Sequence, residues 1–283
     1  MWPIRAIAAL AAIAAVAVGP ARAEDRWFTT SDGVRLHYIE EGRGPTVVLV
    51  PGWTMPAWIF DKQIVDFARD WHVVALDPRG QGDSDIARGG YRPDRRGEDI
   101  AELIRHVSTA PVLLLGWSLG VLDSLAYLHN NGDAAVAGLV LVDNSVGEDP
   151  PPSGGGHRMH ASGHVTRDMI MRDFVQSMFE RPQPPSFLEH LTDVCLRTPE
   201  RVADELLAYP VPRTYWKKSL YSTRRPVLYV VRPHLAGQAE NVRLHDPAAE
   251  SVVLQGVGHA LFVDDAEGFD ALVRDFVRRR VWP

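Results

Sequence analysis

The chain has a single cysteine, Cys195, so an intramolecular disulfide is excluded and stability must come from a buried core. Its place in the apolar and polar run 191–197 predicts a buried small residue rather than a nucleophile. Basic residues are not in excess, since 30 Lys and Arg stand against 36 Asp and Glu. A formal net charge of −6 therefore gives no reason to expect nucleic acid or an anionic lipid surface as a partner.

Long hydrophobic runs are also lacking after residue 18, and the run before it has the layout of a secretory signal peptide. Arg5 gives a short basic start, Ala6–Val18 is apolar, and Pro20 precedes Ala21-Arg22-Ala23. Thirteen apolar residues are too few to span a bilayer comfortably. We expect cleavage of residues 1–23, a periplasmic or secreted protein without stable membrane insertion, and a mature net charge of −8.

The stretch Pro111–Asn130 organises the rest of the chain. It begins with a short apolar run typical of a buried strand and ends in a segment with apolar residues at helical spacing. Between them lies Gly116-Trp117-Ser118-Leu119-Gly120, the G-x-S-x-G pattern of a nucleophile elbow. Glycines at both ends permit a sharp turn and a close approach of strand and helix, so the Ser118 hydroxyl is expected above the sheet edge.

Other apolar runs alternate with helical patterns, which predicts an α/β fold with a mostly parallel, doubly wound sheet. Chemistry in such sheets gathers outside the carboxyl ends of the strands. The residues just past those ends are Trp53, Asp77, Ser118 and Asp143. The expected elements are a hairpin at 27–40, strands at 46–50, 72–76, 111–115, 137–142, 226–231 and 250–255, and helices at 59–71, 94–107, 119–130 and 266–281.

The composition changes at Ser145, where a loop rich in proline and glycine begins. Three helical patterns follow it, at 165–179, 186–196 and 199–207. We therefore expect a helical cap at 146–220, inserted between the two parts of the core at 24–145 and 221–283. Its aromatic and apolar side chains are expected to form either an acyl pocket or the cap's own small core.

A serine nucleophile needs a histidine base, and one of the eleven histidines stands out. His259 lies in Gly256-Val257-Gly258-His259-Ala260, directly after the last predicted strand. Its two glycines allow a short loop to bring the imidazole back across the sheet edge towards Ser118.

These motifs together resemble the α/β-hydrolase fold superfamily, in particular the capped group of esterases, lactonases and cofactor-free haloperoxidase-like perhydrolases. The matching pieces are Pro51-Gly52-Trp53, Asp77–Ser84, Gly116–Gly120 and Gly258-His259 with Phe262. The resemblance covers 27–281 and implies a fold and a reaction type, but no substrate.

The resemblance further implies an oxyanion hole made by the backbone N–H groups of Leu119 and Trp53. Proline at 51 has no N–H where many relatives carry His-Gly, but Trp53 still offers one. No metal and no organic cofactor is implied. Haloalkane dehalogenases and epoxide hydrolases of this architecture place a carboxylate at the elbow, so Ser118 argues against both activities.

The acid of the triad is the open position. The usual place, after the strand at 226–231, has no carboxylate before Glu240. Some relatives carry the acid after the preceding strand, where this chain has Asp143. We favour Asp143, with Glu240 and Asp246 as alternatives. In the segment Asp77–Ser84, we expect Gly80 and Gly82 to permit the turn and Arg79 to pair with a neighbouring aspartate.

The sequence thus predicts a serine hydrolase that acts on a small to medium carboxylic ester or lactone through an acyl-enzyme. A perhydrolase or acyl transferase would use the same triad with peroxide or an alcohol in place of water. A non-catalytic binding protein of this fold is the alternative from another class. The substrate and the oligomeric state are left open.

Overall fold

The structure of the protein is a computed structural model that describes residues 23–152 and 165–283. The predicted signal peptide lies outside the described residues, except for Ala23. Within the described part of the chain, no helix is both long enough and apolar enough to cross a membrane.

In the described part of the chain, eight strands form one mixed, mostly parallel sheet in the order β1-β2-β4-β3-β5-β6-β7-β8. The first two strands make an antiparallel hairpin, and β2 also runs antiparallel to β4. All other neighbours are parallel. The strands are β1 (Glu24–Thr29), β2 (Arg35–Glu41), β3 (Thr46–Val50), β4 (His72–Leu76), β5 (Val112–Trp117), β6 (Val136–Val142), β7 (Val227–Val231) and β8 (Glu250–Val253).

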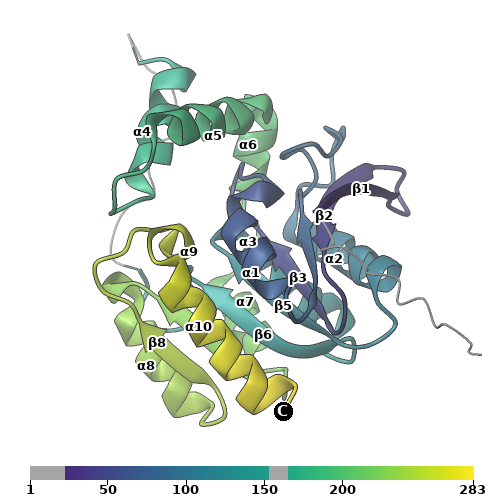
Figure 1. The fold of residues 1–283 in the computed structure, drawn as a ribbon, viewed down its shortest axis with the longest axis vertical. Helices are drawn as coiled ribbons and strands as arrows, with labels where there is room; N and C mark the ends of the chain where they lie inside the picture. The colour runs from purple at the N-terminus through teal and green to yellow at the C-terminus, as the bar shows by residue number, and fades with distance from the viewer. Residues whose placement is uncertain (1–22, 153–164) are drawn as a thin grey trace, which may run out of the picture.

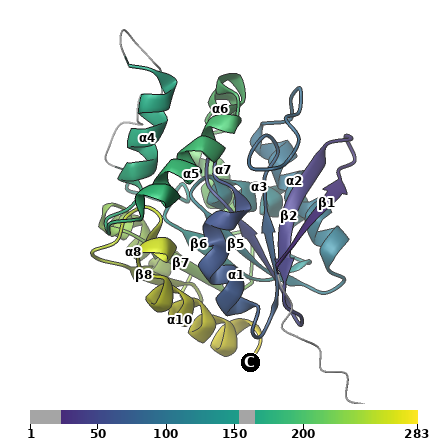
Figure 2. The same cartoon turned by 45° about the horizontal axis from the view of Figure 1, so that its top comes forward.

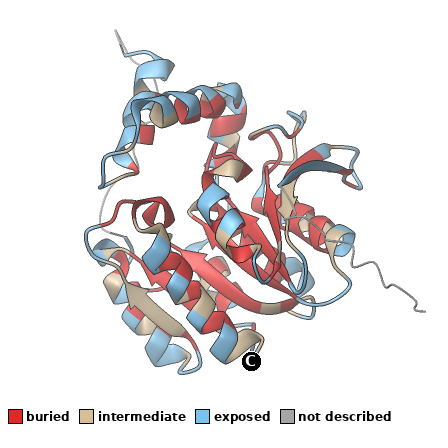
Figure 3. Ribbon diagram, in the orientation of Figure 1, coloured by how far each residue is buried: buried red, intermediate tan, exposed pale blue. Residues whose placement is uncertain are grey.

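The centre of the sheet is buried because helices cover both of its faces (Figures 1 and 3). The strands β3, β5 and β7 consist mostly of valine and leucine and are buried along their whole length. On one face, α1 (Asp61–Phe67) contacts α10 (Ala266–Phe276), and on the other, α2 (Pro93–Val107) packs against α3 (Leu119–Asn131) (Figure 2). This sandwich fixes the strand ends that carry the candidate site.

The described residues between β6 and β7 form four inserted helices: α4 (Arg167–Ser177), α5 (Pro185–Arg197), α6 (Glu200–Leu206) and α7 (Arg213–Leu220). The first three lie together, apart from the helices that flank the sheet (Figure 1). The fourth returns to the core and packs on α3. The three predicted helical patterns correspond to α4, α5 and α6, whereas α7 was not anticipated.

The expected elements differ from the observed ones mainly at their ends. The predicted helix at 59–71 is a short 3-10 turn, Ala57–Phe60, followed by α1. The predicted last helix ends at Phe276 and continues as a π-helical turn over Val277–Val281. The prediction missed the short helices after β7 and β8, which are a 3-10 turn at Pro233–Leu235, α8 (Ala236–His245) and α9 (Leu261–Asp264).

Candidate active site

Ser118 stands at the turn between β5 and α3, with φ of 54°. The flanking glycines are required by close contacts. A Cβ on Gly116 would lie 2.3 Å from the Gly120 carbonyl oxygen, and a Cβ on Gly120 would lie 2.2 Å from the Val50 carbonyl oxygen. The turn therefore holds Ser118 over the carboxyl ends of the central strands, as the elbow motif predicts.

A continuous series of hydrogen bonds joins Ser118, His259 and Asp143. The distance from His259 Nε2 to Ser118 Oγ is 2.8 Å, and that from His259 Nδ1 to Asp143 Oδ2 is 2.7 Å. With Nδ1–H donating to the carboxylate, Nε2 is free to accept the serine proton. The three side chains come from the loops after β5, β6 and β8, so the fold brings together residues that are 116 and 141 positions apart.

Asp143 is the acid that the structure brings to His259. Its side chain is fully buried, and it also accepts bonds from the backbone N–H and the Nε of Arg232. Burial alone would raise the pKa of Asp143, but the hydrogen bond and charge of His259 and the charge of Arg232 outweigh it and hold the pKa below its ordinary value. Asp143 is therefore ionised at neutral pH and suited to stabilise an imidazolium.

The other two candidate acids have different partners. Glu240 lies in α8 and forms an exposed ion pair with Arg243 at 2.8 Å. Asp246 follows that helix and accepts a hydrogen bond from the backbone N–H of Ala248 at 3.0 Å. Both carboxylates thus serve local structure in the α8 region.

The loop that carries His259 is held on two sides. The indole Nε1 of Trp117 donates to the carbonyl oxygen of His259 at 2.9 Å. The carboxylate of Asp264 accepts from the N–H of Gly258 at 2.7 Å and from the N–H of Glu180, beyond α4, at 2.8 Å. A Cβ on Gly258 would lie 2.4 Å from the Met178 carbonyl oxygen. The histidine loop and the end of α4 are consequently packed as one unit.

The two backbone donors predicted for the oxyanion hole flank the serine. Leu119 is the first residue of α3, where N–H groups have no partner within the helix. Trp53 follows Gly52, and a Cβ on Gly52 would lie 2.9 Å from Ser118 Cβ and 3.3 Å from Ser118 Oγ. The loop after β3 therefore lies directly against the serine side chain, within reach of an oxygen that develops beside it.

Aromatic side chains link that loop to the inserted helices. The Trp53 indole donates to the Ala203 carbonyl oxygen in α6 at 2.7 Å, and its ring meets Phe174 of α4 edge to face at 5.1 Å. Trp216 instead packs against Tyr209 and Tyr215. Some of the apolar residues of the insert thus approach the site, while others form the insert's own packing.

Three residues other than glycine have positive φ in the described part of the chain, and all belong to this region. They are Thr54, Ser118 and Asp143, with φ of 59°, 54° and 48°. Residues other than glycine rarely adopt a positive φ, and a β-branched residue such as Thr54 is especially strained there. Strained backbone of this kind gathers at functional sites, where the surrounding structure enforces it.

The segment Asp77–Ser84 was expected to be a local turn, and the structure gives its charged residues longer-range partners. Arg79 does not pair with Asp77 or Asp83; it is buried and bonds to Asp99 at 2.6 Å and to Asp32 at 3.0 Å. A local pairing was predicted because sequence spacing favours neighbours, whereas the guanidinium reaches across to α2.

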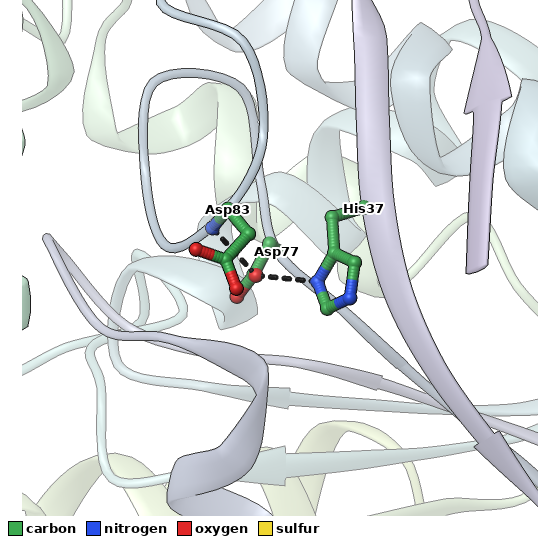
Figure 4. Close-up of side chains that lie close together, drawn as sticks. All are labelled: His37, Asp77 and Asp83. Atoms are coloured by element: carbon green, nitrogen blue, oxygen red, sulfur yellow. Dashed lines mark hydrogen bonds and ion pairs between the residues drawn. The ribbon is translucent and has the colours of Figure 1, made fainter. Parts of the chain in front are cut away.

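Among the described residues, one group of side chains has the spacing of a metal site: His37, Asp77 and Asp83 (Figure 4). Hydrogen bonds within the fold account for it. The Asp77 carboxylate accepts from His37 Nδ1 at 2.7 Å, from the Asp83 N–H at 2.8 Å and from the Ala57 N–H at 2.5 Å. The group ties β2 and β4 to the loop after β3, and we assign it no ion.

Cys195 is fully buried, and its Sγ lies 4.0 Å from Met55 Sδ. Burial raises the pKa of the thiol to about 12, so the side chain is held protonated and unreactive at neutral pH. It behaves as the buried small residue that the sequence predicts.

The chain is similar in sequence to a family of known proteins and to several curated relatives. A profile of the alpha/beta hydrolase family matches residues 47–272. Haloalkane dehalogenase 2 of Mycobacterium tuberculosis is 36% identical over 121 residues, which is 42% of this chain and 41% of that protein. A non-heme haloperoxidase of Rhodococcus erythropolis is 30% identical over 115 residues, or 40% and 42% of the two chains. The chain thus aligns with about two fifths of the length of these curated relatives.

Solved structures cover more of the chain. An esterase of Rhodococcus sp. ECU1013 is similar over 90% of this chain and 98% of its own, with a TM-score of 0.78 and 26% identity. Further structures of the same fold, 17% to 23% identical, are named as an esterase, an N-acyl homoserine lactone degrading enzyme, a bromoperoxidase and an epoxide hydrolase. At that identity they report on the fold alone.

Proposed function

Because this chain belongs to the alpha/beta hydrolase family, we propose that it is a serine hydrolase that cleaves a small to medium carboxylic ester or lactone. One observation carries the proposal: the hydrogen-bonded series from Ser118 Oγ through His259 to the buried carboxylate of Asp143. A hydroxyl, a base and an orienting acid in this order form the arrangement that activates serine for attack on a carbonyl.

In the proposed reaction, Ser118 Oγ attacks the acyl carbonyl while its proton passes to His259 Nε2. The tetrahedral oxyanion accepts hydrogen bonds from the N–H groups of Trp53 and Leu119. The intermediate collapses as His259 returns the proton to the leaving alcohol, and an acyl-enzyme forms. Water, deprotonated by His259, then attacks the acyl-enzyme, and His259 returns the proton to Ser118 Oγ as the acid leaves. The Asp143 carboxylate stabilises the imidazolium in both halves of the cycle.

The serine favours acyl transfer over the chemistry named for the dehalogenase relative. A dehalogenase of this architecture attacks carbon with a carboxylate at the elbow, and this chain has Ser118 there. The similarity to the esterase of Rhodococcus sp. ECU1013 supports a carbonyl substrate, and it leaves the acyl and alcohol parts of that substrate open.

The test is labelling with a fluorophosphonate, which phosphonylates activated serines with loss of fluoride, followed by peptide mapping. We expect labelling at Ser118 in the wild-type protein, none in Ser118→Ala, and strong loss in His259→Ala. Hydrolysis of p-nitrophenyl butyrate should follow the same order. A folded wild-type protein that neither labels nor turns over this ester contradicts the proposal and favours a ligand-binding role. A peracid formed on addition of peroxide would favour a perhydrolase instead, and a transesterified product formed on addition of an alcohol would favour an acyl transferase.

We also propose that the mature protein is periplasmic or secreted and begins after Ala23. The support is the basic, apolar and small-residue order of residues 1–23. The test is expression in a bacterial host, followed by N-terminal sequencing of the exported protein. An exported protein that still begins at Met1, or a protein found in the cytoplasmic fraction alone, contradicts the proposal.

A further inference from the structure

Gln81, in the turn after β4, binds the loop after β3 with every polar atom of its side chain. Its Oε1 accepts from the N–H of Thr54 at 2.7 Å, and its Nε2 donates to the carbonyl oxygen of Gly52 at 3.1 Å and weakly to that of Met55 at 3.4 Å. The side chain is buried, with 1% of its surface exposed. A buried carboxamide satisfied by one short loop fixes that loop's backbone.

These bonds set the direction of the Trp53 N–H. The carbonyl of Gly52 and the N–H of Trp53 belong to one planar trans peptide, so they point in opposite directions. The carbonyl is directed to Gln81, and the N–H therefore points away from Gln81. Gly52 itself lies against Ser118, because a Cβ there would be 2.9 Å from Ser118 Cβ. The bond to Gln81, together with the Met55 N–H, which donates to the same carbonyl at 3.2 Å, thus fixes the direction of the N–H donor in a peptide that adjoins the serine.

The loop needs such support because its backbone is strained. Thr54 has φ of 59°, a conformation that a β-branched residue avoids. The bond from its N–H to Gln81 and the bond from its hydroxyl to the Trp53 carbonyl at 2.7 Å oppose relaxation. Without the carboxamide, the loop can relax towards ordinary φ, and such a rotation would turn the adjoining peptides, including the one that carries the Trp53 N–H.

The turn that carries Gln81 is itself rigid. The Asp77 carboxylate holds the far end of the same loop through the Ala57 N–H at 2.5 Å, and it also accepts from the Asp83 N–H at 2.8 Å. A Cβ on Gly82 would lie 2.1 Å from the Asp77 carboxylate, so the turn packs tightly on this group. The loop after β3 is therefore anchored at both ends by one segment.

We infer that Gln81 is a positioning residue that aims the Trp53 N–H at the oxyanion, an inference that rests on the proposed serine hydrolase function. Gln81 does not touch the substrate, and its contribution is to the transition state, where the oxyanion forms. Loss of the carboxamide should therefore lower kcat and leave KM nearly unchanged.

The experiment compares Gln81→Met with Gln63→Met in the mature protein. Gln63 is a matched control because it is also fully buried and its carboxamide also bridges two elements, donating to Phe262 O at 3.0 Å and Asp270 Oδ1 at 2.9 Å. The readouts are kcat and KM for p-nitrophenyl butyrate and the inhibition constant of phenylethaneboronic acid. This boronic acid bonds to the serine oxygen and places an oxygen in the oxyanion hole.

We expect Gln81→Met to lower kcat about 10- to 100-fold, to change KM less than about threefold and to weaken the boronic acid by a factor similar to that in kcat. Gln63→Met should leave all three near wild type. If Gln81→Met fails to fold, as judged by circular dichroism, Gln81→Leu replaces it. That variant also lacks both the acceptor for Thr54 and the donor to Gly52, so the same pattern is expected.

Wild-type kcat in the Gln81 variant overturns the inference, as does a loss of kcat with unchanged boronic acid inhibition. These outcomes are distinct from failure of the proposed function. If the wild-type protein neither labels with fluorophosphonate nor hydrolyses the ester, the serine hydrolase proposal fails and takes this inference with it. A labelled, active wild type with an equally active Gln81→Met overturns the inference alone.

Discussion

Arg232 binds both carboxylate oxygens of Asp143: its backbone N–H donates to Oδ1 at 3.0 Å, and its Nε donates to Oδ2 at 2.6 Å. Arg232 directly follows β7, the strand after which the triad acid of this fold usually stands, and Asp143 follows the neighbouring strand β6. A cation thus stands near the usual place of the acid and braces the carboxylate supplied by the adjacent strand.

Replacing Arg232 with methionine should lower kcat/KM about 5- to 10-fold and move the acidic limb of its pH profile to higher pH. The Arg232 charge favours the ionised carboxylate, so its removal favours the protonated form of the Asp143–His259 pair. Arg232→Lys keeps the charge without the planar donor, so its kcat/KM should fall between those of the wild type and Arg232→Met. The measurement is kcat/KM from pH 5 to 9, and an unmoved acidic limb would show that Arg232 acts on structure alone.

Asp143→Asn should reduce kcat by about a thousandfold or more, because the amide cannot stabilise the imidazolium and favours the wrong histidine tautomer. The two other acids weighed from the sequence supply matched controls. Glu240→Gln and Asp246→Asn should keep wild-type kcat, since both side chains are engaged in the α8 region. Steady-state kinetics on the three variants would expose a wrong assignment if either control, rather than Asp143→Asn, lost activity.

Asp264→Ala should lower the free energy of unfolding by about 2 to 4 kcal/mol, since it leaves the buried N–H of Gly258 and the N–H of Glu180 without their acceptor. Activity should fall as well, because the same carboxylate holds the loop of His259. Amide hydrogen exchange should become faster at both residues together. Asp265→Asn is the control, since that carboxylate is partly exposed and 3.5 Å from its partner Arg181. Unchanged exchange at Glu180 would show that Asp264 does not hold the insert and the histidine loop together as one unit.

Glu148→Gln should destabilise the protein at neutral pH and progressively less in acid. The carboxylate side chain is 1% exposed and accepts from Lys217 Nζ and the Tyr221 hydroxyl, both at 2.6 Å. Burial would raise the pKa of Glu148, but these hydrogen bonds prevail and lower it to about 2. Because the folded pKa lies below the unfolded one, the stabilisation is complete above about pH 5 and is lost as the pH falls towards 2.

The expected loss in Glu148→Gln is about 2 to 3 kcal/mol at pH 7. Urea unfolding at pH 7 and pH 3 gives the two values. The exposed pair of Glu240 and Arg243 offers the comparison, because Glu240→Gln should change the unfolding free energy by less than about 0.5 kcal/mol at either pH. An equal deficit of Glu148→Gln at both pH values would mean that the charge is not what stabilises this contact.

The fold could be predicted from the sequence where the signal is local. Thr46–Val50 and His72–Leu76 coincide with the predicted strands because continuous apolar runs bounded by turns are typical of a buried sheet. Helix α8 was missed because its residues, AGQAENVRLH, show no clear apolar face. Helix α7 was missed because it is short and its apolar side chains are few.

Part of the candidate site could likewise be predicted from local sequence, and part could not. Ser118 and His259 stand in glycine-bounded motifs, so their neighbourhood in the sequence identifies them. The residues that brace the site carry no such mark, because Arg232 is 89 positions from Asp143, and Asp264 is 84 from Glu180. Only the order of the strands brings them together. Once β6 and β7 are taken as neighbours, opposite charges at their adjacent ends are a usable signal for the pair of Asp143 and Arg232.

The left-handed conformations of Thr54, Ser118 and Asp143 have a consequence for any effort to make this protein more heat resistant. Glycine adopts such φ values without a steric penalty, so selection for folding alone would favour it at these positions. At 118 and 143 glycine would remove the proposed nucleophile and the carboxylate that bonds to His259. At 54 it would remove none, but it would free the backbone beside Trp53 to move. Glycine at position 54 is therefore expected to increase resistance to heat and to slow turnover.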